Sequence, residues 1–171
     1  MIRLLGASVI LFATTVSGIL IARGYRNRPK ELRQWRSALQ AMESEILYGK
    51  VPIEELADHL SQQLPAPVSF FFRDLHRSLA SGKKSLLEAW NETIEDFWPA
   101  TSLKRAEKEI IIQFGATLGT QDADNQKKHI QLTLAHLERE EQEARAARAA
   151  NEKMIKSLGF LAGLLIVLLF L

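Results

Sequence analysis

The last third of the chain, residues 120–171, reads TQDADNQKKHIQLTLAHLEREEQEARAARAANEKMIKSLGFLAGLLIVLLFL. It contains no proline, and its first glycine is Gly159. The stretch begins polar and charged, and it carries no charge from Ser157 to Leu171. The absence of helix-breaking residues predicts one helix, and about 50 residues would give a rod of roughly 75 Å. One end of this rod is expected in a helical bundle and the other in a lipid bilayer.

A second apolar stretch lies near the N-terminus. Leu4–Ala22 carries no charge and no proline, and about 19 residues are enough to span the hydrocarbon core. Six basic residues follow, opposed only by Glu31: Arg23, Arg26, Arg28, Lys30, Arg33 and Arg36. The positive-inside rule then places the N-terminus outside and the next residues in the cytoplasm. A cleaved signal peptide is the alternative, which the dense basic cluster and the lack of a clear A-x-A site disfavour.

The C-terminal run is shorter than the N-terminal one. Ser157–Leu171 would form a helix of about 22 Å against a hydrocarbon core of about 30 Å. Met154 and Ile155 extend the span if Lys153 and Lys156 reach toward the membrane surface. Further basic residues precede the run, so its polar side is also expected in the cytoplasm. Both ends therefore predict two membrane spans, a location in the cell membrane and a cytoplasmic central domain.

Small residues recur four apart within both predicted spans. Gly18 and Ala22 form one pair, and Gly159 and Gly163 form the other. Such pairs allow helices to approach closely in lipid. We interpret them as faces through which the two spans pack together or the chain forms a homo-oligomer. The alternative is that they only reflect the frequency of glycine in spanning helices.

The residues between the spans show helical periodicity and no convincing alternation of apolar and polar positions. The predicted first helix has Pro29 in its first turn. Its buried face is expected to hold Leu32, Trp35, Leu39, Met42 and Ile46. The second helix is expected to open at Pro52, the third to follow Pro67, and Gly82 to end the third.

The fourth and fifth helices have their own start signals. Ser85 and Glu88 predict a capping box for the fourth, and the fifth is expected to begin near Thr101 or Ser102. Thr120 is the expected cap of the final helix. The fourth helix is expected to bury Leu87, Trp90, Ile94 and Phe97. The fifth is expected to bury Leu103, Ala106, Ile110, Phe114 and Leu118.

The predicted fold is an all-α, six-helix up-down bundle flanked by two transmembrane helices. An even number of helices returns the chain to its starting side, as a domain with both ends in one membrane requires. Gly49–Leu56 resembles Gly82–Ala89 at an offset of 33 residues, which indicates two pseudo-repeated helical hairpins or convergent turn punctuation. The expected divisions are residues 1–28 (span and basic flank), 29–137 (bundle), 138–156 (helical stalk, or a mobile connector) and 157–171 (second span).

Composition and motifs argue against chemistry in this chain. There is no cysteine and the net charge is +2, so disulfides, thiolate chemistry and a nucleic-acid partner are not expected. None of the four histidines lies in a metal-binding motif, and no phosphate-binding or nucleophile motif occurs. We therefore expect no catalytic residue, metal or cofactor. The remaining candidate is a protein-interaction surface at the membrane-distal end of the bundle, made by Lys50, Lys83, Lys84, Gln121 and Asp122.

Several short segments, together with the two apolar ends, carry a resemblance to a known family: Leu32–Trp35, Glu45–Gly49, Leu118–Gly119, Asp122 and Gln126. In this order and spacing, which covers nearly the whole chain, they resemble the stage III sporulation protein AB family of endospore-forming bacteria. The segment Gly49–Leu56 also makes the bundle similar to the cytoplasmic domain of the inner-membrane platform protein of type II secretion and type IV pilus systems.

The resemblance implies a non-enzymatic platform in a secretion-like channel at the mother-cell membrane facing the forespore. It implies a cytoplasmic ring ATPase, stage III sporulation protein AA, and the other stage III sporulation proteins of the same complex as partners. The chain has one helical domain where the secretion platform has two, so platform stoichiometry is not carried over. The alternatives are a membrane-tethered helical stator or signalling adaptor, and an enzyme with a membrane hairpin, for which no cluster of titratable residues is found.

Overall fold

The computed structural model describes the backbone of residues 2–46, 51–119 and 123–170, and the side chains of residues 23–46, 51–119, 125–151 and 154. Within these ranges the chain is helical and contains no strand, which confirms the predicted all-α class. The helices are α1 (Ile2–Ser44), α2 (Ile53–Gln63), α3 (Val68–Ala80), α4 (Leu86–Phe97), the 3-10 turn η2 (Trp98–Ala100), α5 (Arg105–Thr117) and α6 (Ala123–Phe170).

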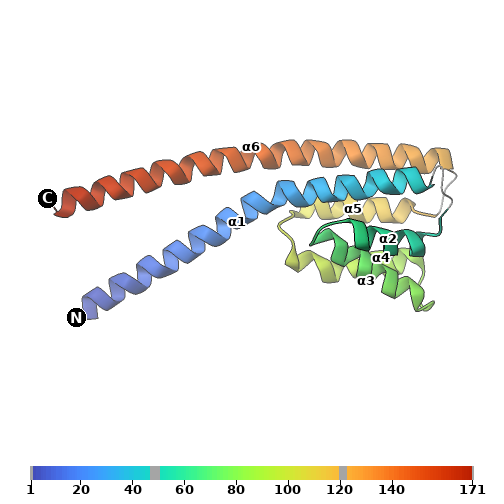
Figure 1. Ribbon diagram of the computed structural model, residues 1–171, viewed down its shortest axis with the longest axis horizontal. Coiled ribbons are helices and arrows are strands. Elements are labelled where there is room, and N and C mark those ends of the chain that lie inside the picture. The colour runs from blue at the N-terminus through green and yellow to red at the C-terminus, as the bar shows by residue number, and fades with distance from the viewer. Residues whose placement is uncertain (1, 47–50, 120–122, 171) are drawn as a thin grey trace.

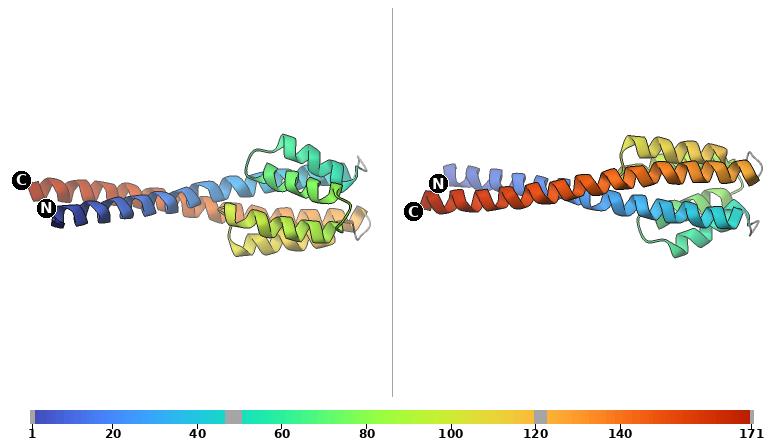
Figure 2. Two further views of the ribbon diagram at one scale, coloured as in Figure 1. Left: turned by 90° about the horizontal axis from the view of Figure 1, so that it is seen from below. Right: turned by 90° about the horizontal axis from the view of Figure 1, so that it is seen from above.

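The helices run alternately up and down (Figure 1). Helix α1 packs against α6, and α5, α4, α3 and α2 follow as successive neighbours, with α2 and α3 returning to α1. The N-terminal part of α1 and the C-terminal part of α6 extend from the same end of the bundle, as all three views show (Figures 1 and 2). The bundle therefore has a stem end, where these two helices leave it, and a distal end.

The final helix agrees with its prediction, whereas the first does not. Helix α6 is one helix of 48 residues, and Thr120, its expected cap, lies outside the described residues. Pro29 was expected in the first turn of a new helix, but α1 is continuous through it. Proline removes one hydrogen bond inside a helix, yet here the flanking turns pack on α6 and Arg28 is anchored by carboxylates of α5 and α6.

An aromatic cluster around Trp35 of α1 forms the centre of the core. The indole is fully buried, and its ring centroid lies 4.9 Å from that of Phe71 and 6.2 Å from that of Phe97. Phe72 and Trp90 complete the cluster. The predicted buried face of the first helix is thus confirmed, since each of its members is buried or packed against the core. One residue expected inside on α4 is wrong, because Leu87 is 46% exposed.

Helix α5 begins later than predicted, and one residue of its predicted buried face is wrong. The chain makes the η2 turn and an extended segment before Arg105, so Thr101 and Ser102 precede the helix. Four of the five predicted residues are buried or packed against the core, namely Leu103, Ile110, Phe114 and Leu118. Ala106 is wrong, because it is exposed and its neighbour Glu107 is buried. Glu107 accepts a hydrogen bond from the Lys104 backbone N–H, which satisfies one of the free donors at the start of α5.

The turn between α3 and α4 follows its sequence signals. Gly82 has a φ of +64°, a left-handed conformation that favours glycine. The predicted capping box is confirmed: the Glu88 N–H donates to the Ser85 hydroxyl, and the Ser85 N–H donates to the Glu88 carboxylate. Helices α2 and α4 begin 33 residues apart, at Ile53 and Leu86. Pro52 immediately precedes α2, as its predicted place at the start of the second helix implies, and its side chain makes no capping hydrogen bond.

Among the residues whose side chains are placed, no helix has a stretch long and apolar enough for a membrane span. Both stretches predicted to span, 4–22 and 157–171, lie entirely outside those residues, and so therefore do the side chains of Gly18, Ala22, Gly159 and Gly163. The backbone there is helical, as parts of α1 and α6.

Candidate protein-interaction site

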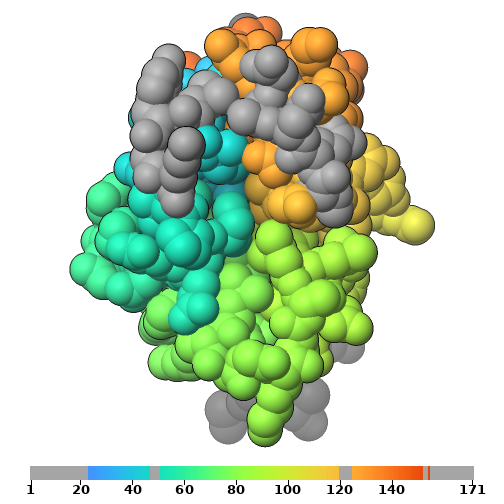
Figure 3. All heavy atoms as spheres, turned by 90° about the vertical axis from the view of Figure 1, so that its right-hand side faces the viewer, coloured from blue at the N-terminus to red at the C-terminus, as the bar shows by residue number. Residues whose placement is uncertain are grey.

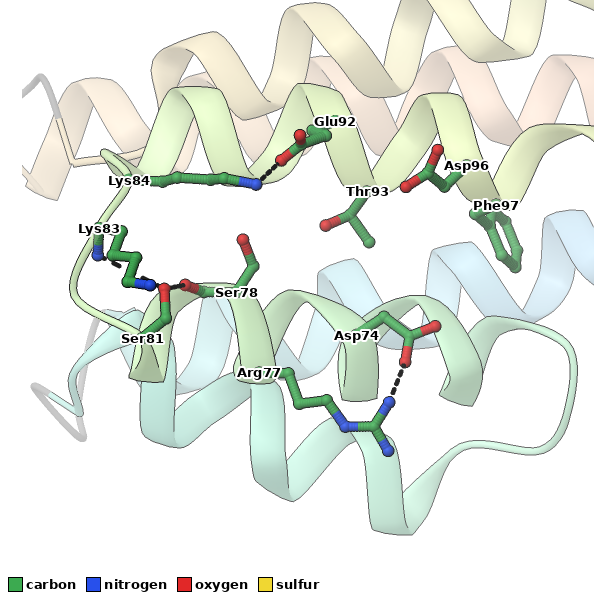
Figure 4. A pocket seen from close by; sticks show the side chains of 10 residues that line it. All are labelled: Asp74, Arg77, Ser78, Ser81, Lys83, Lys84, Glu92, Thr93, Asp96 and Phe97. Atoms are coloured by element: carbon green, nitrogen blue, oxygen red, sulfur yellow. Dashed lines mark hydrogen bonds and ion pairs between the residues drawn. The ribbon is translucent and has the colours of Figure 1, made fainter.

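Helices α3 and α4 lie side by side and leave a groove between them. Its volume is about 530 Å³. Figure 4 shows its side chains projecting from both helices and from the turn that joins them. The lining residues are Asp74, Arg77, Ser78, Ser81, Lys83, Lys84, Glu92, Thr93, Asp96 and Phe97. The groove begins at the distal end of the bundle, where α3 ends and α4 starts (Figure 3).

Most charges in the groove are paired within the chain. Lys84 forms an ion pair with Glu92, and an Arg77 guanidinium nitrogen lies 3.2 Å from a carboxylate oxygen of Asp74. The Ser81 hydroxyl donates to the Ser78 carbonyl oxygen at 2.7 Å. The groove is therefore a polar surface rather than an apolar pocket, suited to a charged partner segment more than to a small apolar ligand.

The structure brings two of the predicted partner residues together in this groove. Lys83 and Lys84 both line it (Figure 4). Lys50, Gln121 and Asp122 lie outside the described residues. Asp96, which sequence reasoning missed, lies at the other end of the groove from Lys83. Only the pairing of α3 with α4 brings Asp96 into the site.

A buried ionic cluster at the stem end joins α1, α5 and α6. The Arg28 side chain is 6% exposed; its Nε donates to Glu107 at 2.7 Å and its Nη2 donates to Glu140 at 3.0 Å. Glu143 lies 3.8 Å from Nη1 at the cluster's edge. Burial raises the pKa of Glu107, and the hydrogen bonds from Lys104 and Arg28 oppose this. The cluster fixes the first helix to the last where both leave the bundle.

A second ionic cluster lies on the same pair of long helices. Arg36 Nη1 donates to the Glu141 carboxylate at 2.7 Å, and Arg33 and Arg145 contact it as well. Burial acts to raise the pKa of Glu141, but hydrogen bonds from Arg36 and Arg145 hold it below its ordinary value. Glu140 and Glu141 accept hydrogen bonds from arginines of α1, and Ala144 is buried. Residues of the predicted stalk, 138–156, are therefore in contact with α1.

Comparison with known proteins identifies the family. The family model for stage III sporulation protein AB matches residues 3–171. The chain belongs to the stage III sporulation protein AB family. It is 47% identical to stage III sporulation protein AB of Bacillus subtilis (strain 168) over the full length of both chains. This confirms the resemblance inferred from the sequence.

A solved structure of a member of this family has the same fold. The structure of a stage III sporulation protein AB is 40% identical in sequence to this chain and superposes with a TM-score of 0.69. The match covers 98% of that chain and 72% of this one. The helical bundle is therefore shared within the family.

The two histidines of α6 line a separate hollow between α5 and α6. His129 and His136 flank a cavity of about 300 Å³, with Ile110 and Phe114 among its apolar lining. Across the residues with placed side chains, no group of three or more histidine and carboxylate side chains could hold a metal ion. This hollow offers packing space rather than coordination chemistry.

The buried Glu31 predicts a pH dependence of stability. Burial raises the pKa of Glu31 above its ordinary 4.5, although the Ser102 N–H donates to its carboxylate at 2.8 Å. A raised pKa in the folded state stabilises the fold fully below the ordinary pKa, and this contribution is lost as pH rises through the raised value. Glu31→Gln keeps an acceptor for Ser102 but does not titrate.

We therefore expect the unfolding free energy of the wild type to fall relative to that of Glu31→Gln as pH rises from about 4 to about 7. Urea unfolding of the full chain in detergent micelles, followed by tryptophan fluorescence, measures the difference at each pH. Differences that stay constant, or that change in favour of the wild type, would contradict the expectation.

Proposed function

We propose that this chain is a non-enzymatic membrane platform that acts in endospore formation, as a component of a secretion-like channel complex. The observation that carries the proposal is the arrangement of α1 and α6. Both helices run from the distal end of the bundle through its core and leave together at the stem end (Figure 2). A force or signal received at the distal end would thus reach the stem end through continuous helices. Membership of the stage III sporulation protein AB family supports the role in sporulation.

In this proposal the stem end faces the membrane. The uncharged stretches 4–22 and 157–171 would be the spans, with the N-terminus outside and the bundle in the cytoplasm. Arg23 and Arg26, exposed where α1 leaves the bundle, fit the positive charge expected at the cytoplasmic surface. The membrane would be that of the mother cell facing the forespore.

The distal end would receive the cytoplasmic partner. Following the family resemblance, we assign this role to the ring ATPase, stage III sporulation protein AA, and expect the other stage III sporulation proteins to contact the membrane part. The α3–α4 groove is the proposed docking site, because it opens at the distal end, at the turn between α3 and α4, and presents charged side chains. The chain itself would contribute binding and positioning rather than catalysis.

Coupling between the two ends would depend on the ionic clusters. Arg28 connects α1 to Glu107 of α5 and Glu140 of α6, and Arg36 connects α1 to Glu141 of α6. Because buried charges lose much when separated from their partners, these contacts oppose sliding of α1 along α6. A push on the bundle would then move both long helices together.

Reversal of the distal lysines tests the docking site. We expect Lys50→Glu, Lys83→Glu and Lys84→Glu, combined, to weaken binding of purified stage III sporulation protein AA by about tenfold or more, because like charges would then meet across the interface. Binding to the full chain in lipid nanodiscs can be measured by biolayer interferometry. A matched triple reversal at the exposed Lys30, Arg105 and Arg139, which lie away from the distal end, makes the same change in net charge and should bind nearly as wild type. Equal binding by the distal and control variants would remove the assignment.

A further inference from the structure

The charges of the α3–α4 groove are sorted along its length. Lys83 lies in the turn at the distal end, and Asp96 lies in the last turn of α4 (Figure 4). We propose that the groove binds a helix of the partner that carries an acidic residue opposite Lys83 and a basic residue opposite Asp96. The partner would then dock in one orientation. This inference rests on the proposed function, in which the groove receives a cytoplasmic protein.

The internal ion pairs leave these two residues as the groove's available charges. Lys84 is neutralised by Glu92 and Arg77 by Asp74. Among the side chains that the structure places, neither Lys83 nor Asp96 forms an ion pair. A partner would therefore meet one unpaired cation at the distal end and one unpaired anion at the inner end.

Between Lys83 and Asp96 the lining carries no net charge, since its ions are paired, and it offers acceptors. Near the middle, Thr93 donates its hydroxyl hydrogen to the Ala89 carbonyl at 2.7 Å. At the distal end, beside Lys83, Ser81 donates to Ser78 at the same distance (Figure 4). Their oxygens can still accept hydrogen bonds from a ligand. An uncharged polar stretch of a partner can therefore bind this region through hydrogen bonds alone.

Lys83 and Asp96 lie at positions where their charges are unfavourable for the stability of α4. A helix dipole favours negative charge near the N-terminus and positive charge near the C-terminus. Lys83 lies two residues before the Ser85 cap, and Asp96 lies in the last turn, which contains no basic residue. These charges do not stabilise α4, so a role toward a partner accounts for them better than a role in the fold.

The spacing specifies the partner segment. Lys83 and Asp96 are separated by roughly the length of α4, which has 12 residues and is ~18 Å long. A partner helix that lies in the groove between α3 and α4 can run parallel to the axis of α4. On a helix, residues 11 apart are separated by just over three turns, or ~16 Å, so an acidic and a basic residue about 11 apart on the partner helix would share the face that enters the groove.

The direction in which Asp96→Lys changes binding separates this inference from simple charge attraction. Binding of purified stage III sporulation protein AA to the full chain in nanodiscs is measured for Lys83→Glu, Asp96→Lys and the double swap. We expect each single variant to bind about tenfold more weakly and the double swap more weakly still, because both contacts become repulsive. If overall charge decides binding, Asp96→Lys tightens it and the double swap restores it, which would overturn the inference.

Matched controls keep the result interpretable. Lys127→Glu on α6 and Glu55→Lys on α2 make the same charge changes at exposed positions outside the groove, and both should bind within about twofold of wild type. Asp96→Lys removes an unfavourable charge from the end of α4, so circular dichroism should show an intact fold. If the wild type does not bind, both the platform proposal and this inference fail. If the distal triple reversal weakens binding but Asp96→Lys does not, only this inference fails.

Discussion

Replacing Arg28 with alanine should destabilise the bundle by about 3–5 kcal/mol. The Arg28 side chain is almost completely buried and donates hydrogen bonds to Glu107 and Glu140. Without the guanidinium, the carboxylates of Glu107 and Glu140 would remain in the interior with no cation that contacts both of them. Burial already raises the pKa of Glu107, so the loss of Arg28 should favour protonation or exposure of this group. Because the cluster joins three helices, the stem end should loosen first.

Urea unfolding of the full chain in micelles measures this effect, with the buried Trp35 and Trp90 as fluorescent reporters. The control is the neutral triple variant Arg28→Met, Glu107→Gln, Glu140→Gln, which removes the buried charges of the cluster. Neutral replacements of a buried ion pair are often tolerated, so this variant should recover most of the lost stability. A cost below about 1 kcal/mol for Arg28→Ala would place the cluster among weak surface pairs and contradict the interpretation.

Local signals were sufficient to predict most helices, and the errors have a physical pattern. Apolar residues at three- and four-residue spacing identify the face of α1 that carries Trp35, and Ser85 with Glu88 marks the start of α4. Pro29 and the start of α5 were misread because tertiary contacts overrode local preference. The burial of Glu107 was missed for a related reason, since its partner Arg28 lies 79 residues away in the sequence.

The interaction groove was only partly predictable for a similar reason. Lys83 and Lys84 follow a glycine stop and precede a cap, so a sequence pattern places them in an exposed turn. Asp96 is an ordinary acidic residue of a helix and becomes part of a site only when α4 lies beside α3. Arg28 was read as one of several positive charges at the membrane flank, whereas it is a structural cation whose partners lie 79 and 112 residues away.

Replacing Gly115 with alanine should also destabilise the protein, by about 3 kcal/mol. Gly115 lies on the buried face of α5, and a Cβ at this position would overlap the indole ring of Trp90. Trp90 cannot easily move away, because its Nε1 donates to the Ile111 carbonyl oxygen at 3.1 Å and its ring packs against Phe71 and Phe114. Intrinsic helix propensity alone predicts the opposite sign, a gain of about 1 kcal/mol for alanine over glycine.

Two further variants isolate the steric cause. Gly24 of α1 is also helical, and nothing lies within 4 Å of a Cβ built on it, so Gly24→Ala should stabilise α1 by up to about 1 kcal/mol. In a Trp90→Ala background the space beside Gly115 is open, and Gly115→Ala should then cost nothing or stabilise. Thermal unfolding in micelles of the wild type, Gly115→Ala, Trp90→Ala and the double variant gives the coupling energy between positions 90 and 115. Additive effects at the two positions would mean that α4 and α5 can separate to accept the methyl group, and that their close packing is not what requires glycine.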